Sequence, residues 1–300
     1  MGTRVRIVAE ASRDSVSTAA SEAALREIER MEGLLSTWDP ESALGRLNAL
    51  PIGTSVEVEE ELAALLSEAE AWAERTGRAF DPTVGALLDA WQVRGEGRVP
   101  SDEALRGALA ATGPGAMAIS GGRAERRAAG AWIDSGAFGK GAALRSAASA
   151  ARHSGAVRFL IDLGGQIWAE AEAEAAWPVE VAHPRERHWT VVRLRVHGVS
   201  VATSGASERP GHLLDPRNGR PVTDWGSVTV GTADPLEADV LSTALYVMEP
   251  DVGFEWAQAH GVAALFLEAT PEGLVVTPTR AMVAWQATAR ETKHEQSNHP

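Results

Sequence analysis

The stretch WPVEVAHPRERHWTVVRLRVHGVSVAT, residues 177–203, indicates the fold class. It holds three short apolar runs, at residues 177–182, 190–196 and 199–203, that are separated only by brief polar connections. Such closely spaced runs predict consecutive strands of an antiparallel meander. Because no helix separates these strands, we expect an α+β fold with mixed or antiparallel sheets rather than a doubly wound parallel sheet.

Outward from this stretch, helices and strands follow one another without an internal repeat or a long linker. Apolar residues recur along one helix face at Ala24, Ile28, Met31 and Leu35. Helices are expected at about 16–35, 59–75, from 101, 142–153, 235–248 and up to 261, and further strands at 3–9, 156–163, 227–232 and 262–267. Residues 36–52 and 113–122 are expected to be loops. The predicted organisation is one domain over residues 1–288 and a disordered polar tail at 289–300.

Composition excludes several classes of protein. The 300 residues include 44% hydrophobic residues, enough for a sizeable core, and the charge sum of 28 basic and 41 acidic residues is −13. So acidic a chain is a poor general nucleic-acid binder, because phosphate affinity needs clustered cations. Cysteine is absent, which excludes disulfides, thiolate metal sites and cysteine nucleophiles.

The N-terminus has neither the basic nor the apolar region of a signal peptide, and no apolar run approaches the ~20 residues of a membrane span. A cytoplasmic protein is therefore expected from the chain as written. An exported or membrane-anchored protein is the alternative, since a trimmed leader would leave no trace.

The segment IDSGAFGKGAA, residues 133–143, combines a Gly-rich turn with the start of a helix. Glycines allow a ligand to approach the backbone, and helix N-terminal amides bind anionic oxygens. It is not a Walker A loop, because Gly141 stands where that motif needs Ser or Thr. A turn with an exposed lysine is the alternative. Lys140 is one of only two lysines beside 26 arginines, which favours a specific role for its ammonium group.

Two further segments carry donor atoms. In EADVLSTAL, residues 237–245, Asp239 and Thr243 lie one helical turn apart, and their oxygens suit a hard cation such as Mg²⁺. An ordinary first-turn acid beside a tolerated surface threonine is the alternative. In HLLDPRNGRP, residues 212–221, the Asp-Pro and Asn-Gly pairs predict a turn, in which His212 is either functional or a chance histidine.

The segment AFDPTVGALLDAW, residues 79–91, has mostly core spacing, and Asp81-Pro82-Thr83 is expected to cap a helix that starts near Val84. Most of the ten tryptophans are expected in the core. Trp38 is the exception, because it lies in a polar loop without periodic apolar neighbours. A partly exposed ring that stacks on a ligand is therefore predicted at Trp38.

Taken in order, these segments resemble the ApbE-type FAD:protein FMN transferases, or flavin transferases. The resemblance runs from Met1 to about Leu267. No single segment is specific, but eight in family order are hard to obtain by chance. The matching segments are MGT (1–3), LLSTWDPESALGRLN (34–48), AFDPTVG (79–85), DSGAFGKG (134–141), DLGGQI (162–167), VATSG (201–205), HLLDPRNGRP (212–221) and EADVLSTAL (237–245).

The resemblance implies Mg²⁺-dependent transfer of FMN from FAD to a threonine of an acceptor protein, with release of AMP. It also implies an α+β body in two parts, with FAD in the cleft between them. The implied metal ligands are the carbonyl of Ala137 and the side chains of Asp239 and Thr243. The implied FAD contacts are Met1, Trp38, Ala79, Phe80, Asp81, Asp134, Lys140, Thr203, Ser204, Gly205, His212 and Leu213. His212 is the expected proton acceptor, on the pKa range of histidine alone.

The sequence also departs from the family pattern. The family often has Asp at Arg145, GGD where Gln166 follows two glycines, Thr at Asn218, an aromatic after TSG where Ala206 and Ser207 stand here, and tyrosine at Trp38. The implied metal positions are intact, so the departures bear on substrate and partner choice. Two alternative functions stay open: an FAD pyrophosphatase that yields FMN and AMP, and a non-catalytic flavin-binding protein.

Overall fold

The first strand and helix follow the expected hydrophobic spacing. A computed structural model describes residues 3–11, 13–206 and 211–286. In strand β1 (Val5–Glu10), half-buried and exposed residues alternate. Helix α1 (Asp14–Leu35) buries the predicted stripe, including Ala24, Ile28 and Met31. Both elements begin within two residues of their predicted starts.

Seven strands form the main sheet, in the order β1-β5-β6-β9-β12-β13-β14, and all neighbouring pairs are antiparallel. The strands beside β1 are β5 (Arg158–Leu163), β6 (Gln166–Glu170), β9 (Val199–Gly205), β12 (Gly226–Thr232), β13 (Ala263–Thr270) and β14 (Gly273–Pro278). The predicted strands among them are confirmed. Strands β6 and β14 were not expected; each returns along the preceding strand through a two-residue turn, at 164–165 and 271–272.

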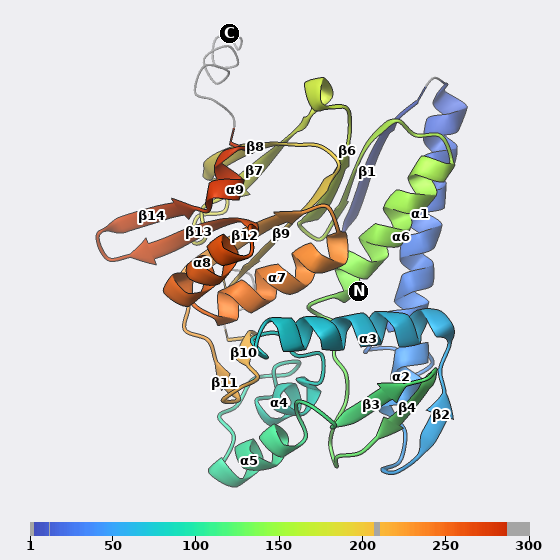
Figure 1. Ribbon diagram of the computed structural model, residues 1–300, viewed down its shortest axis with the longest axis vertical. Coiled ribbons are helices and arrows are strands. Elements are labelled where there is room, and N and C mark those ends of the chain that lie inside the picture. Colours follow the sequence, from blue (N-terminus) through green and yellow to red (C-terminus); the bar gives the residue numbers. More distant parts are fainter. Residues whose placement is uncertain (1–2, 12, 207–210, 287–300) are drawn as a thin grey trace.

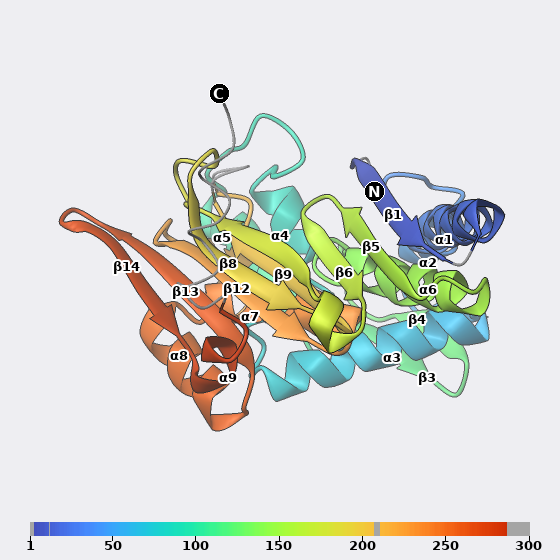
Figure 2. The same cartoon turned by 90° about the horizontal axis from the view of Figure 1, so that it is seen from above.

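Helices pack on one face of this sheet and a strand pair packs on the other (Figures 1 and 2). Helix α6 (Gly139–His153) contacts β5, β6 and α1, and helix α7 (Pro235–Val247) contacts β9 and β12. On the other face, the valines of β7 (Trp177–Ala182) and β8 (Thr190–Val196) pack on Val201, Leu265 and Leu267. The α+β class is thus confirmed.

The predicted three-strand meander is wrong. Strands β7 and β8 form a separate two-stranded sheet, and β9 pairs with β6 and β12 instead. The physical reason lies in burial: the apolar residues of β7 and β8 cover the second face of the main sheet, which would otherwise be open to water.

A smaller part lies below the main sheet in Figure 1, with helix α3 (Glu60–Arg75) running across its top. Helix α3 buries Leu62, Leu65, Leu66, Ala69 and Trp72, as its spacing predicted. The other elements of this part are α2 (Ala43–Asn48), α4 (Gly85–Ala90), α5 (Asp102–Ala110) and a sheet of β2 (Ser55–Glu57), β4 (Arg123–Arg126) and β3 (Met117–Ser120).

Three local predictions for this part are wrong. The expected loop at 36–52 contains α2, whose first turn is capped by Ser42, and the expected bend at 113–122 contains β3. Asp81 does not cap α4, which begins without a side-chain cap. The Asp81 carboxylate instead pairs with Arg78 and accepts the Thr83 N–H, each at 2.8 Å.

The remaining elements complete the two parts. They are a 3₁₀ turn (Ala173–Ala175), the short strands β10 (Leu214–Asp215) and β11 (Arg220–Pro221), and helices α8 (Pro250–Ala259) and α9 (Arg280–Val283). Within residues 3–11, 13–206 and 211–286, no helix is long and apolar enough to cross a membrane. The predicted tail at 289–300 lies outside the described residues.

Candidate active site

The turn before α6 is held by two segments that are distant from it in the sequence. The Asn48 side chain bonds both backbone groups of Ile133, at 2.8 and 2.9 Å. The N–H of Asp134 donates to the Pro82 carbonyl at 2.8 Å, and the Ser135 hydroxyl donates to the Leu35 carbonyl at 2.7 Å. Segments 34–48, 79–85 and 134–141 of the family pattern therefore meet at this turn.

Asp239 of α7 faces the first turn of α6. Its side chain is only 4% exposed. The Oδ1 atom accepts from the Lys140 ammonium at 2.9 Å, and Oδ2 accepts from the Gly141 N–H, also at 2.9 Å. The same ammonium lies 3.5 Å from the Gly136 carbonyl. A carboxylate and a backbone carbonyl thus converge on one cation, and Asp239 and Lys140, which the sequence places 99 residues apart, are in direct contact.

The end of strand β9 brings hydroxyl groups beside Asp239's helix. Ser204 Oγ lies 2.9 Å from Ser242 Oγ and 3.5 Å from Thr243 Oγ1. Thr203 Oγ1 lies 2.8 Å from Thr229 Oγ1 of β12, the neighbouring strand in the sheet. The TSG segment is therefore adjacent to α7, with Ser204 at the predicted metal-binding residue Thr243.

Oxygen donors of the kind that a hard cation binds stand in the turn before α6 and on α7. Ala137 directly follows Gly136, whose carbonyl already faces a cationic group beside Asp239. The Lys140 ammonium and the Gly141 N–H each donate a hydrogen bond to one Asp239 oxygen. Because a carboxylate has about four lone-pair sites, these two bonds leave others for a metal ion. Oxygen ligands of this kind suit Mg²⁺, which often keeps several waters and few protein ligands. Among the described residues there is no cluster of three or more His, Asp or Glu, so any cation here relies on such a sparse set.

Two departures from the family pattern meet at the start of α7. Arg145 of α6 bonds Glu68 of α3 at 2.7 and 2.8 Å and Asp234 at 2.6 and 3.1 Å. Asp234 caps α7 by accepting the Leu236 N–H at 2.8 Å. These bonds, first that with Glu68, raise the pKa of Arg145 above its ordinary value against the effect of burial. Arg145 therefore ties α3, α6 and α7 together.

Gln166 supports the same helix start from the sheet. Its buried side chain donates to the Pro235 carbonyl at 2.8 Å and to Ser200 Oγ at 3.4 Å. Pro235 is the first residue of α7, as predicted. Both unusual side chains thus brace the helix that carries Asp239 and Thr243, and in the part of the chain that the structure describes neither is hydrogen-bonded to those two residues.

Trp38 is 65% exposed, which confirms the predicted exposure of its ring. Arg94, which was not expected from the sequence, lies over this ring and pairs with Asp134. No motif or periodicity marks Arg94, because it stands in an irregular segment after α4. The structure therefore joins Trp38 to the turn at Asp134 through an unexpected side chain.

The predicted FAD contacts on segment 79–85 lie inside the fold. Ala79, Phe80 and Asp81 are each at most 4% exposed. The Phe80 ring meets Phe138 edge to face, with centroids 6.5 Å apart, so it packs behind the turn before α6. The role of these three residues in binding FAD stays a prediction.

The segment at 212–221 docks on the smaller part. The Trp91 indole donates to the Gly219 carbonyl at 2.7 Å. Asp215 accepts from Arg217 and Asn218 side chains at 2.8 Å, which confirms the predicted turn. His212 and Leu213 precede β10, and the base role of His212 stays a prediction. Met1 lies outside the described residues.

Comparison with known proteins connects this arrangement to a family. The ApbE family model matches residues 1–266. Curated relatives include the FAD:protein FMN transferase of Treponema pallidum, 31% identical over 82% of this chain and 77% of that protein. That of Vibrio cholerae is 27% identical over 83% of this chain and 79% of that protein.

Solved structures agree in fold. The ApbE protein of Thermotoga maritima superposes with a TM-score of 0.86 at 30% identity, covering 95% of this chain and 96% of that one. The apo flavinyl transferase ApbE of Pseudomonas stutzeri gives a TM-score of 0.82 at 26% identity, covering 94% and 97%. With a family match over most of its length and an α+β fold shared with these structures, this chain belongs to the ApbE family, whose curated members above are transferases.

Proposed function

We propose that this protein transfers the FMN moiety of FAD to a threonine of an acceptor protein and releases AMP, with Mg²⁺ bound by Ala137, Asp239 and Thr243. The observation that carries the proposal is the Lys140 ammonium, which lies between the Gly136 carbonyl and the Asp239 carboxylate. The Asp239 carboxylate offsets the charge of this ammonium. In a chain of net charge −13, Mg²⁺ bound beside the pair would therefore supply the positive charge that a pyrophosphate needs.

Lys140 and the start of α6 provide fixed positive charge. Lys140 lies in the first turn of a 15-residue helix, where backbone amides and the helix dipole favour anions. Phosphoryl transfer depends mainly on positioning and on neutralising charge. Magnesium bound at this site would neutralise pyrophosphate charge and orient its oxygens.

The remaining groups position and deprotonate the reactants. In the proposed step the threonine oxygen bonds to the flavin-side phosphorus, and the bond from that phosphorus to the AMP phosphate oxygen breaks. The hydroxyl proton passes to His212, because imidazole is the side chain best suited to act as a general base near neutral pH. The exposed ring of Trp38 stacks on a planar ring of FAD.

The test combines the protein with FAD, MgCl₂ and a threonine-bearing acceptor protein, such as one that a curated relative modifies. We expect the acceptor to gain one FMN group by mass spectrometry, with one AMP released per modified acceptor. The matched control is the acceptor with its threonine changed to alanine. An unmodified acceptor and no AMP, with or without metal, would contradict the proposal.

The same assay separates the alternatives. AMP and FMN formed without an acceptor would identify an FAD pyrophosphatase, in which water takes the place of the threonine hydroxyl. FAD binding without AMP under any condition would identify a non-catalytic flavin-binding protein.

A further inference from the structure

The exposed ring of Trp38 rests on a cation. The guanidinium carbon of Arg94 lies 4.5 Å from the centroid of the Trp38 ring and 4.6 Å from that of the Trp132 ring. Its side chain is 24% exposed, whereas Trp38 is 65% exposed. A guanidinium over an indole is attracted by the ring quadrupole, and partial burial strengthens that attraction.

Hydrogen bonds fix the orientation of Arg94. Its Nη1 donates to the Thr37 carbonyl at 3.0 Å, and Nη2 donates to Thr37 Oγ1 at 2.6 Å and to Asp134 Oδ1. Thr37 directly precedes Trp38. One guanidinium therefore holds both the backbone before Trp38 and the ring itself.

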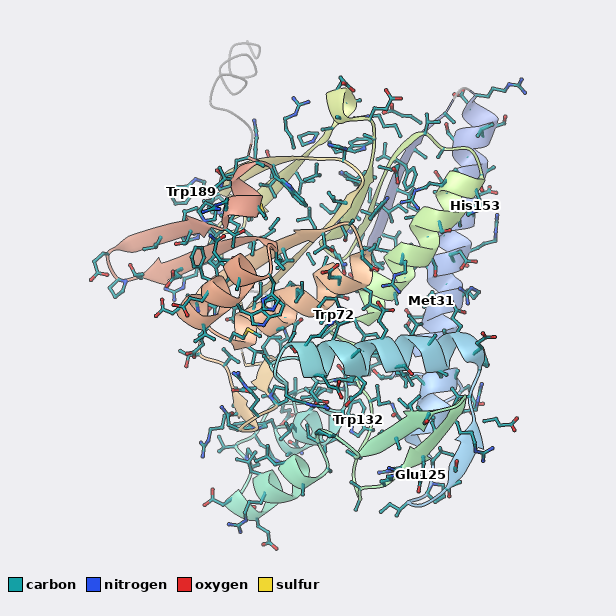
Figure 3. All side chains as sticks on the ribbon, viewed as in Figure 1. Met31, Trp72, Glu125, Trp132, His153 and Trp189 are labelled. Carbon is teal, nitrogen blue, oxygen red and sulfur yellow. The ribbon has the colours of Figure 1, made fainter. Side chains whose placement is uncertain are left out.

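Trp132 forms the inner end of this stack, and Figure 3 shows it below α3 in the smaller part. The Trp132 indole donates to Asp89 Oδ2 at 2.8 Å. A Cβ on Gly85 would lie 2.2 Å from the Trp132 ring, so only glycine leaves room for the ring there. The stack of Trp132, Arg94 and Trp38 is thus anchored from within.

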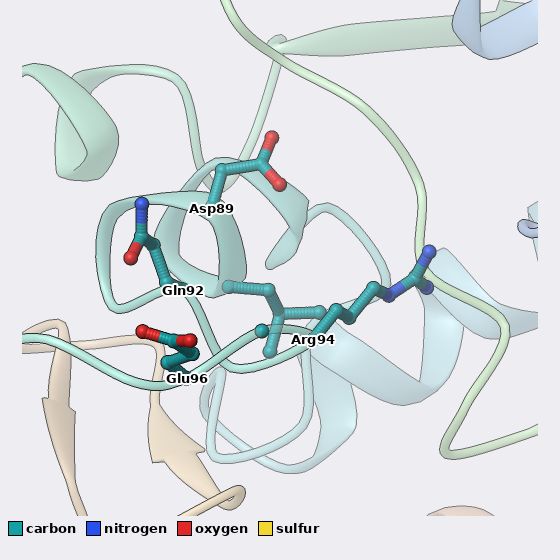
Figure 4. Close-up of a pocket in the computed structure, with 6 residues that line it drawn as sticks. Asp89, Gln92, Arg94 and Glu96 are labelled. Atoms are coloured by element: carbon teal, nitrogen blue, oxygen red, sulfur yellow. The ribbon is translucent and has the colours of Figure 1, made fainter.

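Arg94 reaches this stack by turning away from the polar side chains of its own segment. Its stem lines a pocket of about 440 Å³ together with Asp89, Gln92 and Glu96. Figure 4 shows its guanidinium extending away from these three side chains. The guanidinium thus pairs with Asp134 rather than with Asp89 or Glu96, and its carbon lies within 4.6 Å of the centroids of both indole rings.

We propose that Arg94 is a positioning residue that holds the Trp38 ring in place as a platform for a planar heteroaromatic ring of the dinucleotide. This rests on the proposed function, because FAD supplies both candidate rings. Arg94 acts through Trp38 and is not itself a contact of the ligand. A ring held in its binding orientation loses less conformational freedom when the ligand binds.

A double-mutant cycle on FAD affinity tests this route. We expect Trp38→Ala to weaken FAD binding about tenfold or more, and Arg94→Ala to weaken it about fivefold. The double variant should bind no more weakly than Trp38→Ala alone, because the platform is already lost. Independent, additive losses would show that Arg94 acts through another group, such as Asp134, and would overturn the proposal, as would unchanged binding in Arg94→Ala.

Titration with FMN and with AMP then identifies the ring. Whichever fragment loses affinity in both single variants is the one that stacks on Trp38. If both fragments bind both variants like the wild type, the platform assignment is wrong. Arg94→Lys retains the positive charge but lacks the forked guanidinium that bonds Thr37 and Asp134 at the same time. We therefore expect its FAD affinity to lie between those of the wild type and Arg94→Ala.

Two further measurements separate this proposal from the proposed function. Arg75→Ala removes another arginine over an indole, 4.8 Å from the Trp72 centroid, and should leave FAD binding unchanged. Acrylamide quenching of Trp38, taken as the difference from Trp38→Phe, needs no FAD. We expect stronger quenching of Trp38 in Arg94→Ala, and equal quenching would overturn the Arg94 role. Failure of the wild type to bind FAD would instead contradict the proposed function.

Discussion

Gly141 and Asp239 are joined across two helices by a 2.9 Å hydrogen bond from the glycine N–H to Oδ2. A Cβ at residue 141 would lie 2.4 Å from the Pro235 carbonyl oxygen, so glycine is what lets α6 approach the first turn of α7. The same close approach brings Lys140 within 2.9 Å of Oδ1. The close approach of the two helices at Gly141 therefore determines both how they pack and where the groups of the candidate site lie.

Asp239→Ala is expected to abolish FMN transfer. The change removes the only carboxylate among the proposed ligands and leaves Lys140 without this partner. We expect kcat/KM to fall by at least about 100-fold, as for the loss of a key electrostatic group. The assay is AMP release at limiting and at saturating Mg²⁺.

The matched control for this variant is Glu237→Gln, on the same helix two residues earlier. It changes a carboxyl that is not among the proposed ligands, and it should retain activity with the wild-type dependence on Mg²⁺. Wild-type rates for Asp239→Ala at limiting Mg²⁺ would remove Asp239 from the metal site.

Gly141→Ala is expected to destabilise the fold. The added methyl group would collide with the Pro235 carbonyl and the Leu236 backbone, and overpacking of this kind costs about 1–3 kcal/mol. Urea unfolding should show a lower midpoint with an unchanged slope. Because α6 and α7 must separate, the apparent affinity for Mg²⁺ should fall as well.

Gly107→Ala provides the opposite expectation. Gly107 lies within α5, and nothing lies within 4 Å of the place where its Cβ would stand. Alanine is the better helix former, so this variant should gain roughly 0.5–1 kcal/mol. Equal effects at residues 107 and 141 would contradict the packing argument.

The sequence predicts the elements better than their partners. The stripe of α1 and the Pro235 start of α7 follow from spacing and helix-start chemistry, and both are found. The pairing of β8 with β9 was wrong, because strand pairing depends on which apolar face remains uncovered elsewhere in the sheet. Local pattern carries no information about that distant surface.

The candidate site shows the same limit. Asp239 and Thr243 are recognisable by spacing on one helix, but nothing local links Asp239 to Gly141, 98 residues earlier. Arg94 belongs to no sequence motif, and its proposed role depends on its contacts with Trp38 and Trp132, which lie in other segments of the chain. Asp81 was predicted to cap a helix because the capping rule considers only the backbone that follows the residue. The rule does not include Arg78, whose guanidinium pairs with the Asp81 carboxylate.

Arg145→Ala is expected to loosen the junction of three helices. Glu68 and Asp234 would then face each other without the cation between them. All three side chains are about one third exposed, so water screens much of this interaction, and we expect a loss of only about 1–2 kcal/mol. Urea unfolding at low and high salt measures it, and the loss should shrink as salt rises.

The control for the Arg145 variant is Arg26→Ala on α1. Arg26 lies 3.7 Å from Glu22, and both side chains are more than 60% exposed. Its removal should change stability by less than about 0.5 kcal/mol. If the two variants lose the same stability, Arg145 is an ordinary surface ion pair rather than a brace for α7.

Glu61→Gln should give a stability difference that depends on pH. Arg30 of α1 bonds Glu61 of α3, with one bond of 2.9 Å, and this lowers the pKa of Glu61. A lowered folded-state pKa contributes stability above the unfolded pKa of 4.5 and loses it as the pH falls through the folded value. Both side chains are 44% exposed, so we expect the variant to be only about 0.5 kcal/mol less stable at pH 7. Urea midpoints measured between about pH 7 and pH 3 should converge, and a constant gap would show that the lost stability comes from shape or packing rather than from the charge of Glu61.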